Sequence, residues 1–342
     1  MRYLILASML LAALAFADKP TYTTKDYGQK FEKGFKYNED AMRAFQKRAK
    51  KAHIPTEGGI PGKWDLTPKV SPPENQGSHG TCWDFGIIKA ARSEYMLYGQ
   101  DPGQLSFNWL ICGGRTQYNC DSGGSFDAMN TMLGGKGPWT SANDPYPNCS
   151  GKCVQNGQLP VAVTFDDVVT VGDGTNRPSF KDLAGANSAD VLGHVLVIDV
   201  AVCGAWENYK SGIFNNNQCG PNSINHIINL VGYDCETSLD SSGNCSFNAK
   251  GQPVNGDGYL IVMNNWGTTW GEGGYMRTRW GVDAVANDAA YFKKNWPTPP
   301  GPGPGPSPGP SGGLSWGYLF VMVGLLLVGV LVGWFISREQ YY

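Results

Sequence analysis

The sequence lacks an excess of charge of either sign and has few histidines. It has 27 Lys and Arg against 29 Asp and Glu, a formal net charge of −2 at pH 7, so its charge does not favour nucleic acid as a partner. Of its four histidines, only His79, His194 and His226 follow residue 58. These three are the candidate bases for any nucleophile, and we expect no metal and no cofactor.

The chain begins with a targeting segment and has a low-complexity stretch near its other end. Residues 1–17 combine Arg2, an apolar run and an Ala-Phe-Ala cleavage site, as in a secretory signal peptide. Residues 297–314 are almost all Pro, Gly and Ser, which predicts an extended stalk. The part between them is long enough for one large domain or two lobes.

Residues 315–336 carry no charge and could cross a bilayer as one helix. At about 1.5 Å per residue, such a helix spans roughly the hydrocarbon core. Arg338, in the polar tail of residues 337–342, suits a cytosolic flank. We therefore expect a single-pass type I membrane protein of the secretory pathway, at the cell surface or in the endolysosome or vacuole. Gly329 and Gly333 either support weak self-association of this span or face lipid.

Nine cysteines in a chain expected to be secreted indicate disulfides, and an odd number leaves at least one thiol free or paired between chains. Cys82 is the natural candidate for the free thiol. Asn148 and Asn244 each begin a glycosylation sequon with Cys in the middle. Whether these sequons are used stays open.

The surroundings of Cys82 are those of a reactive thiol. Cys82 precedes an apolar, helix-capable run, and Gln76 lies six residues earlier across a loop with two glycines. The positive end of a helix dipole favours the nucleophilic thiolate, and the Gln76 side chain could donate to a developing oxyanion. On this segment alone, a buried or disulfide-bonded Cys beside a turn is the alternative.

Two further segments supply the partners that a thiolate needs. His226 lies in a strand-like apolar run, where a core histidine is the alternative, and Asn264 ends a second such run just before Trp266. An Asn at a strand end can accept the ring N–H of a histidine and fix its tautomer, while an adjacent Trp shields that bond from water.

Together these segments resemble the papain-like cysteine proteases, the cathepsin family. That family is the standard example of Cys-His-Asn catalysis, with the His about 130–150 residues after the Cys; here His226 follows Cys82 by 144. The resemblance covers about residues 59–292. It also includes the segments Ile60-Pro61, Trp64-Asp65-Leu66, Leu105 to Cys112, Asn119 to Gly124 and Tyr209 to Phe214.

The resemblance implies an α+β, papain-like two-lobe fold. A helical left lobe would carry Cys82, a β-barrel-like right lobe would carry His226 and Asn264, and the active site would lie in the cleft between them. Cys82 would be the nucleophile, His226 the base and then the acid, and Asn264 the residue that orients it. Gln76, with the backbone N–H of Cys82, would form the oxyanion hole.

The same resemblance implies four residues along the substrate cleft. Gly123 and Gly124 would pair the substrate backbone as a short antiparallel strand, and Trp266 would shield the Asn264–His226 pair. Asp288 would lie at the base of the pocket for the second substrate residue before the cut, where it would admit Arg or Lys as well as apolar groups. A solvated surface Asp is the alternative.

Residues 18–58 are similar to the front of the family's inhibitory propeptide but shorter than most. The spacing of six residues predicts an amphipathic helix: Tyr27, Phe31, Phe35, Glu39, Arg43 and Phe45. This helix would leave little chain to run through the cleft. We expect a zymogen, with a folding aid or a stable N-terminal arm as the alternatives. Residues 59–296 would then be the peptidase domain.

The left lobe departs from the family in two ways, at His79 and at Asp84. His79 stands where the family usually has a Cys bridged to the position of Cys120, and we expect this His in an exposed loop. Asp84 replaces a small residue and should point away from the thiol. Four cysteines remain to pair in either of two ways, as Cys112–Cys153 with Cys120–Cys149 or the other way round.

The right lobe lacks the family's Cys near Asp283. We expect Cys203–Cys219 and Cys235–Cys245 as replacements, the latter closing an insertion at residues 236–257. The leading hypothesis is a cysteine endopeptidase that hydrolyses protein and peptide substrates through a thiolate and a thioester acyl-enzyme. A catalytically inactive binding ectodomain and a transferase that uses the same thiol are the alternatives.

Overall fold

The computed structural model describes residues 21–52, 59–112, 115–146, 153–154, 157–172, 176–190 and 192–296. The chain divides into one unit at Met1–Asn295 and another at Trp296–Tyr342, and every element below belongs to the first. Several predicted features lie outside the described residues: the signal peptide (1–17), the stalk (297–314), the span (315–336) with Gly329 and Gly333, the tail (337–342), Asn148 and Cys149.

The prediction of a single-pass type I membrane protein is not supported, and we withdraw it. Within the ranges given above, no helix is both long enough and apolar enough to cross a bilayer. The self-association predicted through the span is withdrawn with it.

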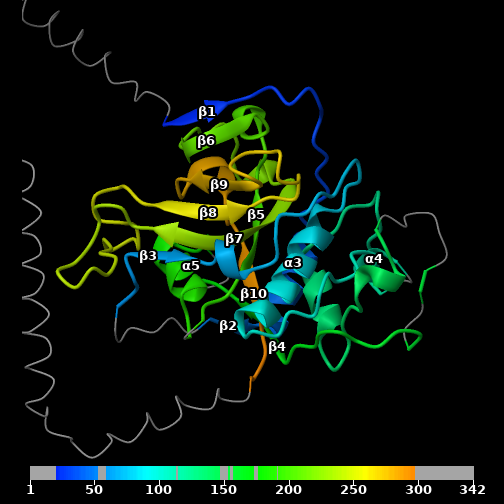
Figure 1. Cartoon of the computed structure of the whole chain (residues 1–342). Helices are drawn as coiled ribbons and strands as arrows, with labels where there is room; N and C mark the ends of the chain where they lie inside the picture. Colours follow the sequence, from blue (N-terminus) through cyan, green and yellow to red (C-terminus); the bar gives the residue numbers. More distant parts are fainter. Residues whose placement is uncertain are drawn as a thin grey trace, which may run out of the picture. The chain divides into compact units, whose positions relative to one another are not determined.

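A mixed sheet forms one half of the fold. Its strands follow the order β1-β6-β9-β8-β7-β5-β10-β4-β2, and β3 pairs with β7 off this path. Figure 1 shows β6, β9, β8 and β7 stacked beside one another. The bounds are β1 Tyr22–Thr24, β2 Lys50–Lys51, β3 Lys63–Asp65, β4 Asp167–Thr170, β5 Leu196–Val200, β6 Tyr209–Phe214, β7 His226–Asp234, β8 Tyr259–Met263, β9 Tyr275–Thr278 and β10 Ala289–Lys293.

The central helix of the other half, α3 (Cys82–Leu97), is buried at all but two of its positions. It packs against β7, where Gly86 permits the approach: a Cβ there would come within 2.6 Å of the Ile227 side chain. Figure 1 shows α3 and the short α4 (Asn108–Ile111) on the same side of the sheet. A helical half and a sheet half confirm the predicted two-lobe α+β class.

One more helix, α5 (Phe180–Asn187), covers the sheet half. Ser179 begins it with a capping box, because the Ser179 hydroxyl accepts from the backbone of Asp182 and the Asp182 carboxylate accepts from the backbone of Ser179. Phe180 and Leu183 pack into the sheet core. Apart from α2, the other helical turns of the described residues are 3₁₀ segments at Thr67–Lys69, Phe126–Met132, Ser141–Asn143, Gly204–Trp206, Pro221–Ser223 and Val282–Ala284.

The N-terminal segment, residues 21–52, supplies the strand at each end of the sheet order. β1 pairs antiparallel with β6 and β2 pairs in parallel with β4, and between them the helix α2 (Glu39–Arg48) packs on the 3₁₀ turn Phe126–Met132. Only residues 39–48 are helical, so the amphipathic helix predicted from Tyr27 onward is wrong in its first half. Residues 27–35 run as irregular chain that buries Phe31 and Phe35.

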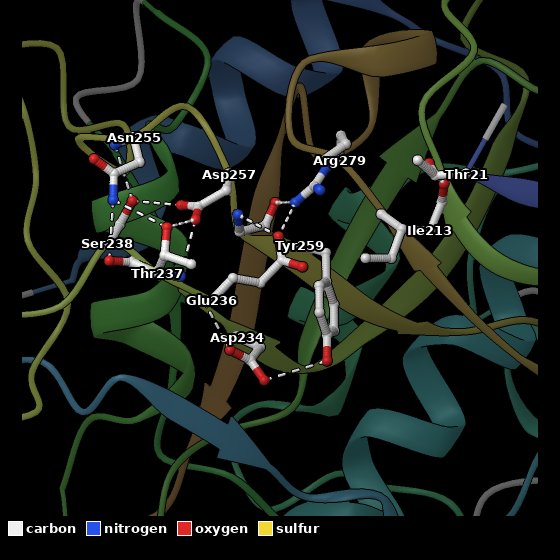
Figure 2. A network of polar contacts seen from close by, with 11 residues as sticks. Thr21, Ile213, Asp234, Glu236, Thr237, Ser238, Asn255, Asp257, Tyr259 and Arg279 are labelled. Carbon is white, nitrogen blue, oxygen red and sulfur yellow. Dashed lines mark hydrogen bonds and ion pairs between the residues drawn. The ribbon is translucent and has the colours of Figure 1, made fainter. Parts of the chain in front are cut away.

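A predicted insertion, residues 236–257, joins β7 to β8 and is closed by Cys235–Cys245. Its ends are tied by a polar network around Asp257, which accepts from the backbone and hydroxyl of Thr237 and from the Ser238 hydroxyl (Figure 2). Asn244, a predicted glycosylation site, lies in this loop. Its Nδ2 donates to Asp240 at 3.4 Å, and its modification stays a prediction.

The described disulfides agree with one of the two predicted left-lobe pairing schemes and with both predicted right-lobe pairs. Cys112–Cys153, Cys203–Cys219 and Cys235–Cys245 are bonded. Cys120 is also disulfide-bonded, and Cys149, its partner in this scheme, lies outside the described residues. Among the described cysteines, Cys82 carries the free thiol.

Candidate active site

Cys82 is the first residue of α3 and is completely buried. Its Sγ accepts two backbone N–H groups, from Gly34 at 3.1 Å and from Ile227 at 3.4 Å. Burial raises the pKa of Cys82 to about 12, although these hydrogen bonds work in the opposite direction. In this state Cys82 is a neutral thiol.

His226, the first residue of β7, directly precedes Ile227, whose backbone N–H reaches Cys82 Sγ. Its Nδ1 has no hydrogen-bond partner among the described residues. Its Nε2 lies 2.8 Å from Oδ1 of Asn264, and this Oδ1 also accepts the N–H of Asn265. Since Oδ1 is an acceptor, Nε2 carries the proton and Nδ1 keeps its lone pair. Burial lowers the pKa of His226 to about 3, so the ring is neutral here.

Trp266 covers the imidazole, with the two rings 4.9 Å apart. This is the shielding position predicted for it. Phe31 of the N-terminal segment also stacks on the Trp266 ring, with the ring centroids 4.5 Å apart.

Gln76 is buried in the loop before α3, and its carboxamide is already engaged. Nε2 donates to the carbonyl of His79 at 2.9 Å and to the carbonyl of Glu32 at 3.1 Å. The Trp266 indole donates to the same Glu32 carbonyl at 3.3 Å. Gln76 Nε2, the donor predicted for the oxyanion, is therefore already hydrogen-bonded to a backbone carbonyl of the N-terminal segment.

The N-terminal segment runs directly over the thiol, contrary to the prediction that little chain is left to fill the cleft. Gly124 donates to the Gly34 carbonyl at 2.8 Å, and its own carbonyl accepts from Lys36 at 3.1 Å. Phe35 and Gly124 form a parallel bridge. A Cβ on Gly34 would overlap the Gly80 carbonyl, and one on Gly123 would overlap the Gly34 carbonyl, so the close approach depends on glycine.

Asp288 lies under α2. Its Oδ1 accepts from Gln46 at 3.2 Å and its Oδ2 from Asn287 at 3.2 Å. Asp288 lines a small cavity together with apolar side chains, both from α2 and from the rest of the fold, namely Met42, Phe45, Phe126, Val171 and Ala289. Burial raises the pKa of Asp288. The solvated-surface alternative does not fit this environment.

The exposed loop expected for His79 is wrong, whereas the direction expected for Asp84, away from the thiol, stays a prediction. Asp84 is fully buried, and neither of its carboxylate oxygens has a hydrogen-bond partner among the described residues. Burial alone raises the pKa of Asp84 well above its ordinary value, which disfavours a negative charge at this position. His79 is only half exposed, with its ring edge-on to Tyr146 at 6.3 Å.

His194 is a buried core residue. Its ring stacks on Tyr291 at 4.2 Å, and its nitrogens lie 3.2 Å from Glu94 Oε2 and 3.1 Å from Asp190 Oδ2. Although burial alone would lower its pKa, the two carboxylates raise the pKa of His194 to about 9. Its ring nitrogens are taken up by this cluster rather than by the thiol.

Two buried residues next to the site were not predicted. Lys89, on α3, donates to the backbone carbonyl of Asn264 at 2.9 Å, and burial lowers its pKa to about 7. Asn265 follows Asn264 and bonds to the carbonyls of Cys82 and Ile227. The Asn-Asn pair at the end of a strand was the visible signal for Asn265, whereas nothing in the sequence marked Lys89 as buried.

The fold and the thiol at the start of its central helix are those of a two-lobe cysteine protease. The sequence model of the papain family of cysteine proteases matches residues 60–292. This chain belongs to that family.

Individual relatives agree with this assignment. The chain is 30% identical over 221 residues to a cathepsin L-like proteinase of Fasciola hepatica, covering 64% of this chain and 60% of the relative. It is 29% identical over 247 residues to a probable cysteine protease, RD21B, of Arabidopsis thaliana, covering 70% and 48%. The chain thus spans about half to three fifths of the length of these relatives.

Among solved structures, the bromelain protease from Ananas comosus in complex with the E64 inhibitor is 28% identical with a TM-score of 0.55, covering 69% of this chain and 100% of that one. A structure that addresses the limited antibody cross-reactivity between the mite allergens Blo t 1 and Der p 1 is 22% identical with a TM-score of 0.61, covering 84% of this chain and 89% of that one. The second likeness shows the fold alone.

Proposed function

We propose that the chain is a cysteine endopeptidase in which Cys82, His226, Asn264 and Gln76 carry the reaction. The observation that carries this proposal is their arrangement: the thiol at the start of α3, the imidazole at the start of β7, and Asn264 fixing the proton on Nε2. That tautomer leaves Nδ1 as the base.

The reaction follows from these positions. His226 Nδ1 takes the thiol proton, and the Cys82 thiolate attacks the peptide carbonyl carbon. The oxyanion accepts hydrogen bonds from Gln76 Nε2 and the Cys82 N–H. His226 then gives its proton to the departing amine, which leaves a thioester on Cys82. Water, deprotonated by His226, attacks the thioester and releases the acid and the thiol.

The proposal includes a zymogen in which residues 18–58 are the propeptide and residues 59–296 the peptidase domain. The described part, residues 21–52, covers the thiol and takes the hydrogen bonds of Gln76 and Gly124. Its chain pairs in the parallel direction with the backbone at Gly124, through the bridge with Phe35. A substrate is expected to pair with the same backbone in the antiparallel direction. The segment therefore blocks the cleft without presenting a peptide bond in the reactive direction.

The same segment accounts for the neutral thiol and imidazole. Both pKa shifts arise chiefly from burial. Removing the segment would readmit water to Cys82 and His226, lower the pKa of the thiol, raise that of the imidazole and so favour the ion pair.

Asp288 is proposed to set specificity for the second substrate residue before the cut. In the closed state α2 fills this pocket with the Met42 side chain and the Gln46 carboxamide, one apolar and one polar group. Once α2 leaves, the carboxylate would accept Arg or Lys while the apolar wall accepts Phe or Leu. Asp288→Ala should lower cleavage of Arg-Arg substrates more than that of Phe-Arg substrates, and equal ratios in both proteins would reject this role.

The function is tested by separating residues 21–52 from the full chain by limited proteolysis with a second protease. Casein digestion and release of fluorophore from peptide substrates should follow, and Cys82→Ala treated identically should give neither. The inactive binding ectodomain is not favoured, because Cys82, His226 and Asn264 are all present, with His226 bonded to Asn264 and its neighbour Ile227 bonded to Cys82 Sγ. Product analysis with added amines distinguishes hydrolysis from transfer: a transferase would accumulate the amide of the added amine.

A further inference from the structure

Asn265 is completely buried, and it bonds to Gln76, Cys82 and Asn264 and to Ile227, the residue after His226. Its carbonyl accepts the N–H of Gln76 at 2.9 Å, and its own N–H donates to Oδ1 of Asn264 at 2.8 Å. Its side-chain Nδ2 donates twice, to the carbonyl of Cys82 at 3.1 Å and to that of Ile227, the neighbour of His226, at 2.7 Å.

The sheet register explains this position. β7 and β8 pair Asn229 with Met263, so continuing the antiparallel register two residues places Asn265 opposite Ile227. The backbone carbonyl of Asn265 is instead bound to Gln76. The side chain therefore completes the β7 ladder at Ile227, and the second hydrogen of the same NH₂ reaches across to α3.

Resting on the function proposed above, we infer that Asn265 is a positioning residue whose carboxamide sets the separation between the nucleophile on α3 and the base on β7. One planar NH₂ group bound to both carbonyls fixes the start of α3 relative to the start of β7. Proton transfer between Sγ and Nδ1 depends steeply on that separation, and a misplacement of about 1 Å can cost about 100-fold in rate.

The chain offers a matched control. Asn229 is also completely buried, and its Nδ2 donates from β7 to the Gly86 carbonyl of α3 at 2.8 Å. It joins the same two elements one helical turn beyond Cys82. If Asn265 did no more than hold α3 to β7, loss of either amide would have the same effect on the reaction.

The experiment compares Asn265→Ala, Asn265→Ser and Asn229→Ala with wild type in the full chain after separation of residues 21–52. We expect Asn265→Ala to lower kcat by about 10- to 100-fold with KM within about twofold, since it contacts no substrate. Asn265→Ser keeps a single shorter donor and should recover part of the loss. Asn229→Ala should lower the melting temperature while kcat stays within about twofold.

A second measurement needs no turnover. The pH dependence of Cys82 alkylation by iodoacetamide reports the thiolate, and its midpoint should move upward in Asn265→Ala but not in Asn229→Ala. Equal effects of the two alanine variants on kcat and on this midpoint would overturn the inference. If wild type cleaves nothing, the proposed function fails, and the alkylation midpoints alone then decide the role of Asn265. Should Asn265→Ala not fold, the Ser variant is read in the same way.

Discussion

Replacing Gly34 by Ala should open the cleft without any proteolysis. A Cβ at this position would overlap the backbone carbonyl oxygen of Gly80, and a backbone atom cannot move aside as a flexible side chain can. The segment must therefore lift away from Cys82.

The magnitude follows from the hydrogen bonds that anchor this stretch. Lifting it breaks four hydrogen bonds: Gly34 N–H to Sγ, Gly124 N–H to the Gly34 carbonyl, Phe35 N–H to the Asn225 carbonyl, and Lys36 N–H to the Gly124 carbonyl. At about 1 kcal/mol each, the loss is about 4 kcal/mol. Because about 1.4 kcal/mol is tenfold, the population with an open cleft should rise by about 700-fold.

The assay is hydrolysis of a fluorogenic peptide by the unprocessed full chain, with gel analysis to show that residues 21–52 are still attached. Gly220→Ala is the control, because a Cβ there meets nothing within 4 Å and its φ is −97°. Unchanged activity of unprocessed Gly34→Ala, with the protein folded, would refute the inhibitory reading of the segment.

Three further predictions concern stability. The pKa of His194 is about 9 in the folded protein, above its ordinary 6.5, so its contribution of about 3 kcal/mol is complete below pH 6.5 and is lost as pH rises through 9. Urea unfolding of wild type and His194→Gln should therefore converge above pH 9, and curves parallel from pH 6 to 10 would contradict the assignment. The pKa of Lys89 is about 7, below its ordinary 10.5. Lys89→Met should therefore be more stable than wild type at pH 6, by up to about 5 kcal/mol, and this gain should shrink as pH rises through 7 to 10.5. A difference in stability that does not change with pH would count against a buried amine. Removing Cys235–Cys245, which closes a separation of 10 residues, by changing both to Ser should cost about 3 kcal/mol while leaving kcat/KM unchanged, and a fall in kcat/KM would tie the insertion to the cleft.

The proposed catalytic residues could be chosen from the sequence because they lie in strong local contexts. Cys82 begins a helix, His226 begins an apolar strand and Asn264 follows another. Two right-lobe disulfides followed from the same alignment of segments. The left-lobe pairing could not be chosen, since four cysteines in one stretch allow more than one scheme.

The course of the N-terminal segment could not be predicted from its own pattern. Phe31 and Phe35 are four residues apart, which is helical spacing, yet Phe31 stacks on Trp266 and Phe35 packs edge-on to Phe126 from irregular chain. Contacts with the cleft, and not local propensity, decide that conformation.

The burial of Asp84 and Lys89 was missed for a related reason. A charged residue in a helix usually marks its solvent face, but α3 is enclosed on nearly every side. Only the tertiary structure shows that burial raises the pKa of Asp84 and that Lys89 reaches the carbonyl of Asn264.

The most direct test of the central claim is labelling of Cys82 by an epoxide inhibitor that alkylates papain-type thiols, before and after residues 21–52 are separated from the full chain. We expect little labelling while Gly34 covers Sγ, rapid labelling at acidic pH once the segment is gone, and a single modified peptide containing Cys82. Folded, processed wild type that does not label, or that labels no faster than a free model thiol at the same pH, would contradict it.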